Sequence, residues 1–176
     1  MLKKNPNQRI GVFVDVQNMY YSAKNLYGKR VNFSQILNEA TSERQLIRAI
    51  AYVIKASMPE EQLFFNALEK AGFEVKSKEV QIFPGGVKKG DWDVGIALDM
   101  IRLAPRLDAL VLVSGDGDYV PLVEYLRNQG HRVEVVAFGK STSAKLIAEV
   151  DEFVDMDADH EKFVFSAKEK LSPKKS

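Results

Sequence analysis

The stretch LVLVSGDGDYVPL at residues 110–122 indicates the fold of this chain. Residues 110–113 are apolar and largely branched, which is typical of a strand buried on both faces of a parallel sheet. Residues 114–118 carry no large apolar side chain, and an apolar pattern of helical period begins at Tyr119. Ligands of open α/β sheets bind at the carboxyl ends of the strands, so Asp116 and Asp118 mark a candidate cation site.

Length and composition exclude several classes of protein. The chain has 176 residues, 45% of them hydrophobic and 28% charged, which suits one well-buried domain. It has no cysteine and two histidines, which excludes disulfides and leaves too few ligands for a zinc site. The formal net charge of +1 argues against a basic coat for nonspecific nucleic-acid binding. Without a membrane span or a secretion signal, we expect a cytoplasmic protein.

Apolar runs alternate with helical periods along the chain. Strands are predicted at residues 10–16, 45–54, 73–82, 109–114 and 132–138, with a short edge strand at 153–156. Helices are predicted at 19–26, 33–38, 60–71, 93–103, 119–129 and 141–150, the last capped by Ser141 or Thr142. Residues 84–92 form a glycine- and lysine-rich loop. This alternation predicts an α/β fold, a single three-layer α/β/α domain with a mainly parallel sheet.

The predicted domain occupies residues 9–157. An extension at residues 1–8 precedes it, and a basic tail at 158–176 follows, which we expect to be flexible. From residue 160 onward this tail contains five lysines and two glutamates.

Aspartates fall at the ends of predicted strands and at the start of a helix. Asp15 ends the first strand, and Asp93 opens a helix that follows the lysine-rich loop. Two carboxylates at about 4 Å repel by roughly 4 kcal/mol at an effective dielectric of about 20, so a cluster favours a divalent cation. Oxygen ligands without histidine or cysteine favour Mg²⁺ or Mn²⁺. Water on such an ion can attack a phosphodiester in line.

These polar residues also have structural interpretations. Asp93 and Asp118 could each cap a helix, and Asp116 could serve only the turn. Asn18 could begin a helix or hold the loop after Asp15.

The second acidic segment leaves a choice between three aspartates. Asp91 is a loop alternative to Asp93. Asp99 lies six residues after Asp93, about 120° around the helix, so both cannot point identically at one ion. We therefore rank Asp99 below Asp93.

The lysines and aromatic residues nearby have two interpretations as well. Lys88 and Lys89 are either solvated or contact a phosphate backbone beside the carboxylates. Trp92, the only tryptophan, is either part of the core or a platform for base stacking. His131 is interpreted as structural.

Three segments together resemble a known family. FVDVQNMYY at 13–21, KKGDWDVGIALDM at 88–100 and SGDGDYVPLVEYLRNQG at 114–130 are similar to the NYN domain of PIN-like nucleases, close to the bacterial LabA-like branch. The resemblance covers residues 9–155, and the S-G-D-x-D-[FY] motif is its most specific part. It implies a parallel sheet with strand order 3-2-1-4-5, an acidic Mg²⁺ or Mn²⁺ pocket, and metal-dependent cleavage of RNA.

The resemblance also implies roles for individual residues. The implied metal ligands are Asp15, Asp93, Asp99, Asp116 and Asp118, and all of these except Asp99 are implied to be catalytic. Asn18 is carried over from the first segment, and Lys88, Lys89 and Ser114 are the other candidate substrate-binding residues. The segment KGDWD departs from the more frequent K-G-x-D, which leaves open whether Asp91 or Asp93 faces the metal.

Other α/β functions fit the sequence less well. The segment after the first strand lacks the glycines of a dinucleotide-binding fold. Gln17 occupies the position where an aspartyl phosphotransferase would have a second aspartate. We therefore expect a metal-dependent ribonuclease that acts on single-stranded RNA. We expect no membrane partner, and the sequence is compatible with a homo-oligomer. The alternative is a non-catalytic regulatory domain that binds RNA or protein and retains the acidic pocket.

Overall fold

Six parallel strands form the central sheet. The computed structural model describes residues 4–86 and 88–166. Across the sheet the strands follow the order β3-β2-β1-β6-β7-β8. Their bounds are β1 Arg9–Asp15, β2 Gln45–Lys55, β3 Glu74–Glu79, β6 Ala109–Val113, β7 Arg132–Ala137 and β8 Glu152–Asp155. The parallel sheet and the implied order of five strands are confirmed, and β8 is added at the edge beside β7.

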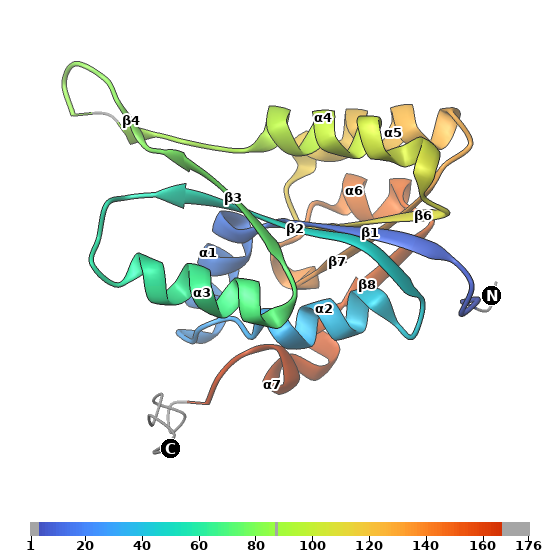
Figure 1. The fold of residues 1–176 in the computed structure, drawn as a ribbon, viewed down its shortest axis with the longest axis horizontal. Coiled ribbons are helices and arrows are strands. Elements are labelled where there is room, and N and C mark those ends of the chain that lie inside the picture. Colours follow the sequence, from blue (N-terminus) through green and yellow to red (C-terminus); the bar gives the residue numbers. More distant parts are fainter. Residues whose placement is uncertain (1–3, 87, 167–176) are drawn as a thin grey trace.

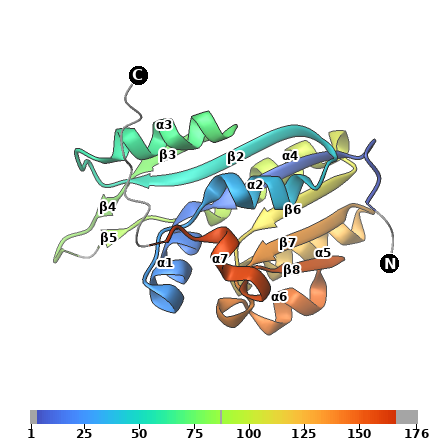
Figure 2. The same ribbon diagram turned by 90° about the horizontal axis from the view of Figure 1, so that it is seen from below.

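Helices cover both faces of this sheet (Figures 1 and 2). Helices α1, α2 and α3 lie on one face, and α4 and α5 lie on the other with α6 beside α5. The helices are α1 Val16–Tyr27, α2 Phe33–Thr41, α3 Glu61–Ala71, α4 Asp93–Leu103, α5 Val120–Asn128, α6 Ala144–Glu149 and α7 His160–Phe163. The 3₁₀ helices are η1 Ala104–Arg106, η2 Gly117–Tyr119, η3 Gly139–Ser141 and η4 Met156–Asp159. Within the described ranges, no helix is long and apolar enough to cross a membrane.

The direction of the chain across the sheet reverses between β1 and β6. From β1 the chain crosses one face through α1 and α2 to β2, whereas from β6 it crosses the other face through α5 to β7. Val14 of β1 pairs with Val113 of β6, so Asp15 and Ser114 leave the sheet side by side. Open α/β sheets bind ligands at such a reversal, outside the carboxyl ends of the strands.

The strands β1 and β6 are the most deeply buried. The side chains of Ile10, Val12, Phe13, Val14 and all of β6 have no exposed surface. Because helices cover both sides of these strands, their sequences are continuous apolar runs rather than alternating ones. Strand β3, at the sheet edge, is largely charged and exposed. Asp15 and Ser114 therefore follow the most deeply buried strands of the sheet.

Two predicted helix starts are wrong by a few residues. The first helix begins at Val16 rather than residue 19, because the Asp15 carboxylate accepts the backbone N–H of Asn18 and caps the helix. The helix predicted at 141–150 begins at Ala144, and its cap is Ser143, not Ser141 or Thr142. The helix predicted at 60–71 is confirmed as α3, and it ends at Gly72 with a φ of 110°.

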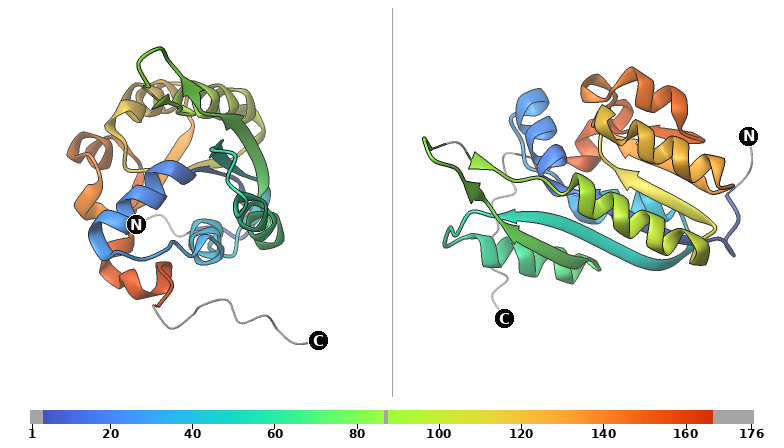
Figure 3. Two further views of the ribbon diagram at one scale, coloured as in Figure 1. Left: turned by 90° about the vertical axis from the view of Figure 1, so that its left-hand side faces the viewer. Right: turned by 90° about the horizontal axis from the view of Figure 1, so that it is seen from above.

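The predicted loop at 84–92 contains a strand. Strands β4 (Gln81–Ile82) and β5 (Lys88–Lys89) pair antiparallel as a separate hairpin, and the strand predicted at 73–82 is accordingly two strands. Gly85 and Gly86 have φ angles of 96° and 81°, which explains the glycine pair at the turn. The hairpin projects at the carboxyl edge of the sheet (Figure 3).

The folded part continues beyond residue 157, where the sequence analysis ended the domain. Phe163 and Val164 are buried, and Val164 forms a backbone bridge with Val31. Two buried apolar residues hold this segment against the core, so the tail expected to be flexible does not begin at residue 158. Its residues 167–176 lie outside the described part of the chain.

Candidate active site

Hydrogen bonds fasten the loop after β1 to the loop after β6. Asp15 is only 9% exposed, and it accepts the Asn18 N–H at 3.2 Å and the Ser114 hydroxyl at 3.3 Å. The side-chain oxygen of Asn18 accepts the Gly115 N–H at 3.0 Å. Ser114 is fully buried, which argues against the predicted substrate contact. Ser114 and Asn18 thus position the two loops relative to each other.

The loop after β6 is a tight turn organised by Asp116. Its carboxylate accepts the Asp118 N–H at 2.9 Å, and its own N–H donates to the Ser114 hydroxyl at 3.2 Å. A Cβ at Gly115 would lie 2.7 Å from Oγ1 of Thr142, so only glycine fits without displacing the loop before α6. The turn interpretation of Asp116 is therefore correct, and it does not compete with a role as ligand, because the turn presents the carboxylate at the sheet edge.

Tyr119 lies between two carboxylates. Its hydroxyl is 3.1 Å from Oδ2 of Asp15 and 3.1 Å from Oδ1 of Asp93. A tyrosine hydroxyl has one hydrogen, so both contacts are hydrogen bonds only when one of the carboxyl groups carries a proton. Burial also raises the pKa of Tyr119, which keeps its hydroxyl neutral. Asp15, Tyr119 and Asp93 therefore form a chain that can share a proton.

The pKa values of both carboxyl groups in this chain are raised. Burial is the largest cause for Asp15 and raises its pKa from 3.8 to about 6, although the bonds from Asn18, Tyr119 and Ser114 oppose it. Burial also raises the pKa of Asp93, and the negative charges of neighbouring aspartates add to this effect. The charge of this site is thus unfavourable in the absence of a cation.

Three aspartates from two segments form an acidic trio. Oxygens of Asp93, Asp116 and Asp118 all lie within 4.8 Å of one another, and the three side chains are partly or fully exposed. This upper limit is slightly larger than the about 4.2 Å that separates opposite oxygens of a Mg²⁺ shell, the largest separation between two ligands of one ion. The trio can therefore hold one divalent cation at the carboxyl edge of the sheet. Asp15 lies outside the trio and is linked to it through Tyr119.

The structure separates the candidates of the second acidic segment. Asp93 joins the trio, whereas Asp91 is exposed and accepts the N–H of Asp93 at 3.3 Å, at the start of α4. Asp99 lies elsewhere, with Tyr52 at 2.8 Å, Lys76 at 2.7 Å and Arg102 at 2.9 Å.

Asp99 is therefore an ion-pair partner rather than a ligand of the trio's cation. Burial alone would raise its pKa, but the bonds from Lys76 and Tyr52 and the nearby cations lower it below the usual value. Its place six residues after Asp93 on the same helix turns it away from the trio, as the helical geometry predicted.

The remaining sequence candidates lie at the edge of the site. Lys88 and Lys89 form β5, but their side chains are outside the described part of the structure, so the phosphate contact stays a prediction. Trp92 packs on Tyr52 with ring centroids 5.3 Å apart and donates its indole N–H to the carbonyl oxygen of Val53 at 2.8 Å. The core interpretation of Trp92 is therefore confirmed.

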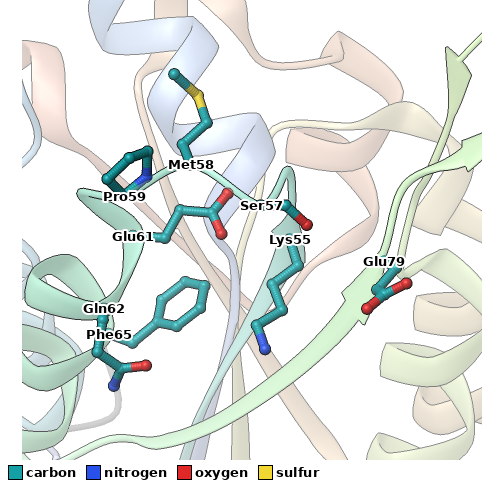
Figure 4. A pocket seen from close by; sticks show the side chains of 8 residues that line it. All are labelled: Lys55, Ser57, Met58, Pro59, Glu61, Gln62, Phe65 and Glu79. Atoms are coloured by element: carbon teal, nitrogen blue, oxygen red, sulfur yellow. The ribbon is translucent and has the colours of Figure 1, made fainter.

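A hollow of about 340 Å³ also lies at the carboxyl edge of the sheet (Figure 4). It is lined by Lys55, Ser57, Met58, Pro59, Glu61, Gln62, Phe65 and Glu79, from β2, β3, α3 and the loop before α3. None of the candidate site residues lines this hollow. The acidic trio, and not this hollow, therefore remains the candidate site.

Sequence reasoning missed Tyr119 as a site residue. The residue was assigned to the start of a helix, and its apolar ring is indeed only 2% exposed. The signal was present in the motif itself, because the last position of S-G-D-x-D-[FY] is Tyr119. Only the fold shows that its hydroxyl reaches Asp15 and Asp93.

Comparison with known proteins agrees with this geometry. The model of the NYN domain matches residues 9–157. The chain is 26% identical over 156 residues to the low amplitude and bright protein LabA of Synechococcus elongatus, covering 84% of this chain and 83% of LabA. The crystal structure of a Vibrio parahaemolyticus protein of unknown function is 37% identical, with a TM-score of 0.83, and covers 93% of this chain and 100% of that protein. With a match over most of its length, the chain belongs to the NYN domain family.

Proposed function

We propose that this protein is a Mg²⁺- or Mn²⁺-dependent ribonuclease that hydrolyses phosphodiester bonds of single-stranded RNA. NYN domains are generally nucleases of the PIN-like superfamily, which makes a nuclease the first candidate. The observation that carries the proposal is the acidic trio at the reversal of the sheet. The sequence has no cysteine, so a cysteine nucleophile is excluded.

The choice of metal rests on the donor atoms. All three members of the trio offer carboxylate oxygens, and hard oxygen ligands suit Mg²⁺ and Mn²⁺ better than zinc. Asp93, Asp116 and Asp118 would hold the cation. When bound, it would lower the pKa of a coordinated water and stabilise charge on the phosphate.

Asp15 and Tyr119 would control which groups of the site carry a proton. Asp15 accepts three hydrogen bonds that fix its orientation, and Tyr119 connects it to Asp93. At a pH above about 6 Asp15 is largely ionised, so it can take up a proton through Tyr119. We assign Asp15 as a positioning and proton-accepting residue behind the trio, not as a first metal ligand.

Substrate contacts would come from the hairpin beside the site. The hairpin of β4 and β5 stands at the carboxyl edge and carries Lys88 and Lys89. Lysines at this place suit a phosphate backbone, and the nearly balanced charge of the chain suits a local rather than a general affinity for RNA. We further propose a cytoplasmic location.

A cleavage assay tests the proposed function. End-labelled single-stranded RNA and DNA are incubated with the protein in Mn²⁺, in Mg²⁺ and in EDTA. We expect RNA cleavage that EDTA abolishes and that Asp93→Asn lowers by at least about 100-fold, since it removes a ligand. Asp91→Asn is the matched control and should retain activity. Cleavage that survives EDTA would contradict a metal-dependent enzyme, and binding of RNA without any cleavage would favour the non-catalytic alternative.

A further inference from the structure

Two neighbouring tyrosines stand exposed on the helix that begins at the site. Tyr20 is 49% exposed and Tyr21 is 50% exposed, and their rings meet edge to face with centroids 5.3 Å apart. Both lie on α1, whose cap is Asp15. An exposed pair of aromatic rings on this helix is a candidate contact surface for a ligand.

The position of these tyrosines relates them to the acidic trio. Tyr21 follows Asn18 by three residues, which is about 4.5 Å of rise on the same side of the helix. Asn18 itself bonds to Gly115, the residue before Asp116. Tyr21 therefore lies about one helical turn from Asn18, and Tyr20, about 100° from Tyr21 around the helix, contacts the Tyr21 ring edge to face. The edge of the sheet seen in the left panel of Figure 3 has α1 on one side and the start of α4 on the other.

The surroundings of the rings are polar and positive rather than apolar. The ammonium of Lys24 lies 5.8 Å from the centroid of the Tyr20 ring. Within residues 4–86 and 88–166, Lys24 has no ion-pair partner. The other outward positions nearby are Gln17 and Asn25, so the rings do not continue into an apolar patch of the kind that protein interfaces need.

Resting on the proposed function, we propose that Tyr20 and Tyr21 form a stacking platform for the bases of a single RNA strand whose phosphate backbone is held by Lys24 and leads to the cation that the trio would hold. Base stacking on aromatic side chains does not require a particular sequence, because every base has a π face. The platform requires unpaired bases, so it makes single strands the substrate class. An exposed lysine beside the ring supplies the positive charge that a backbone needs.

A binding experiment with two oligomers tests the platform. A fluorescein-labelled 12-nucleotide RNA and an abasic oligomer of equal length and charge are titrated with protein in EDTA, with fluorescence anisotropy as the readout. We expect Tyr20→Ala with Tyr21→Ala to weaken RNA binding by about 5- to 150-fold for each base that loses its partner. Binding of the abasic oligomer should not change. The Phe variants at both positions should bind as the wild type does.

Further variants separate stacking from charge and from fold. Lys24→Gln should weaken both oligomers alike and reduce the salt slope by about 0.7. Tyr125→Ala is the matched control, because Tyr125 is 49% exposed on α5 in the opposite layer, and it should have no effect. Thermal unfolding of the double alanine variant checks that the fold is retained.

The outcomes distinguish this inference from the proposed function. Unchanged RNA binding in the double alanine variant, or equal losses for both oligomers, would overturn the platform. So would a change from dimer to monomer in sedimentation with unchanged RNA affinity, since the tyrosines would then serve a protein interface. Absence of cleavage by the wild type in Mn²⁺ would instead refute the nuclease, and base-dependent binding in EDTA would still establish the platform.

Discussion

Replacing Asp15 by asparagine should stabilise the metal-free protein at neutral pH. The pKa of Asp15 rises from 3.8 to about 6 on folding, chiefly because the side chain is buried. A raised pKa means that ionised Asp15 disfavours the folded state, and the shift corresponds to about 3 kcal/mol. The contribution is most favourable below pH 3.8 and is lost as the pH rises through about 6. Asparagine keeps the shape and can still cap α1 through its carbonyl oxygen.

Thermal unfolding in EDTA measures this effect. At pH 7.5, Asp15→Asn should raise the melting temperature by roughly 6 to 12 °C if the full 3 kcal/mol is recovered, at about 2 to 4 °C per kcal/mol for a chain of this size. At pH 4 the advantage should largely disappear, because Asp15 is then protonated in the folded protein. The amide can donate to Tyr119, whose hydroxyl then donates to Asp93, but the buried Ser114 hydroxyl loses its acceptor, which reduces the gain. A lower melting temperature at pH 7.5 would refute this reasoning and show that the cap and the hydrogen bonds outweigh burial.

Two other substitutions should act in the opposite direction. Asp99→Asn should lower stability at neutral pH by up to about 1 kcal/mol, since it removes the charge that pairs with the partly exposed Lys76 and Arg102. Because the pKa of Asp99 is lowered on folding, this loss should shrink below pH 4, which denaturant unfolding at two pH values can measure. Gly115→Ala should cost about 1–3 kcal/mol and lower RNA cleavage, because its Cβ would lie 2.7 Å from Oγ1 of Thr142. A stable and active Gly115→Ala protein would contradict the close packing of these loops.

The sheet could be predicted from the sequence because its central strands are unusual. The runs at 10–14 and 109–113 are apolar on both faces, and this requires helices on both sides. The implied strand order then brought Asp15 next to Ser114 and Asp116.

Other parts of the fold could not be predicted, because they depend on very short strands or on partners far apart in the sequence. The hairpin of β4 and β5 has strands of two residues each, too short for any periodicity to show. Glu134 lies in β7 and is 1% exposed, and its bidentate pairing with Arg44, 90 residues earlier, together with a bond from Arg132, explains a carboxylate in a buried strand. Long-range partners of this kind leave no local pattern in the sequence.

The sequence predicted which residues gather near the site, but not which of them form the acidic trio. Asp93 and Asp116 belong to the trio, as the motifs implied. Asp99 does not belong to the trio, and it pairs instead with Lys76 and Arg102, which lie outside the motif. Asp15 lies behind the trio, because the Tyr119 hydroxyl lies between Asp15 and Asp93. The position of that hydroxyl depends on how α5 and α4 pack.

Calorimetric titration with Mn²⁺ tests the central claim most directly. The wild type should bind one Mn²⁺ per chain, and Asp116→Asn should bind it at least about tenfold more weakly, since the trio loses an oxygen ligand. Asp155→Asn is the matched control, because Asp155 opens η4 with the same turn that Asp116 makes at η2 but lies outside the trio. We predict unchanged Mn²⁺ affinity in Asp155→Asn. Equal affinity and stoichiometry in the wild type and Asp116→Asn would contradict a metal site formed by the acidic trio.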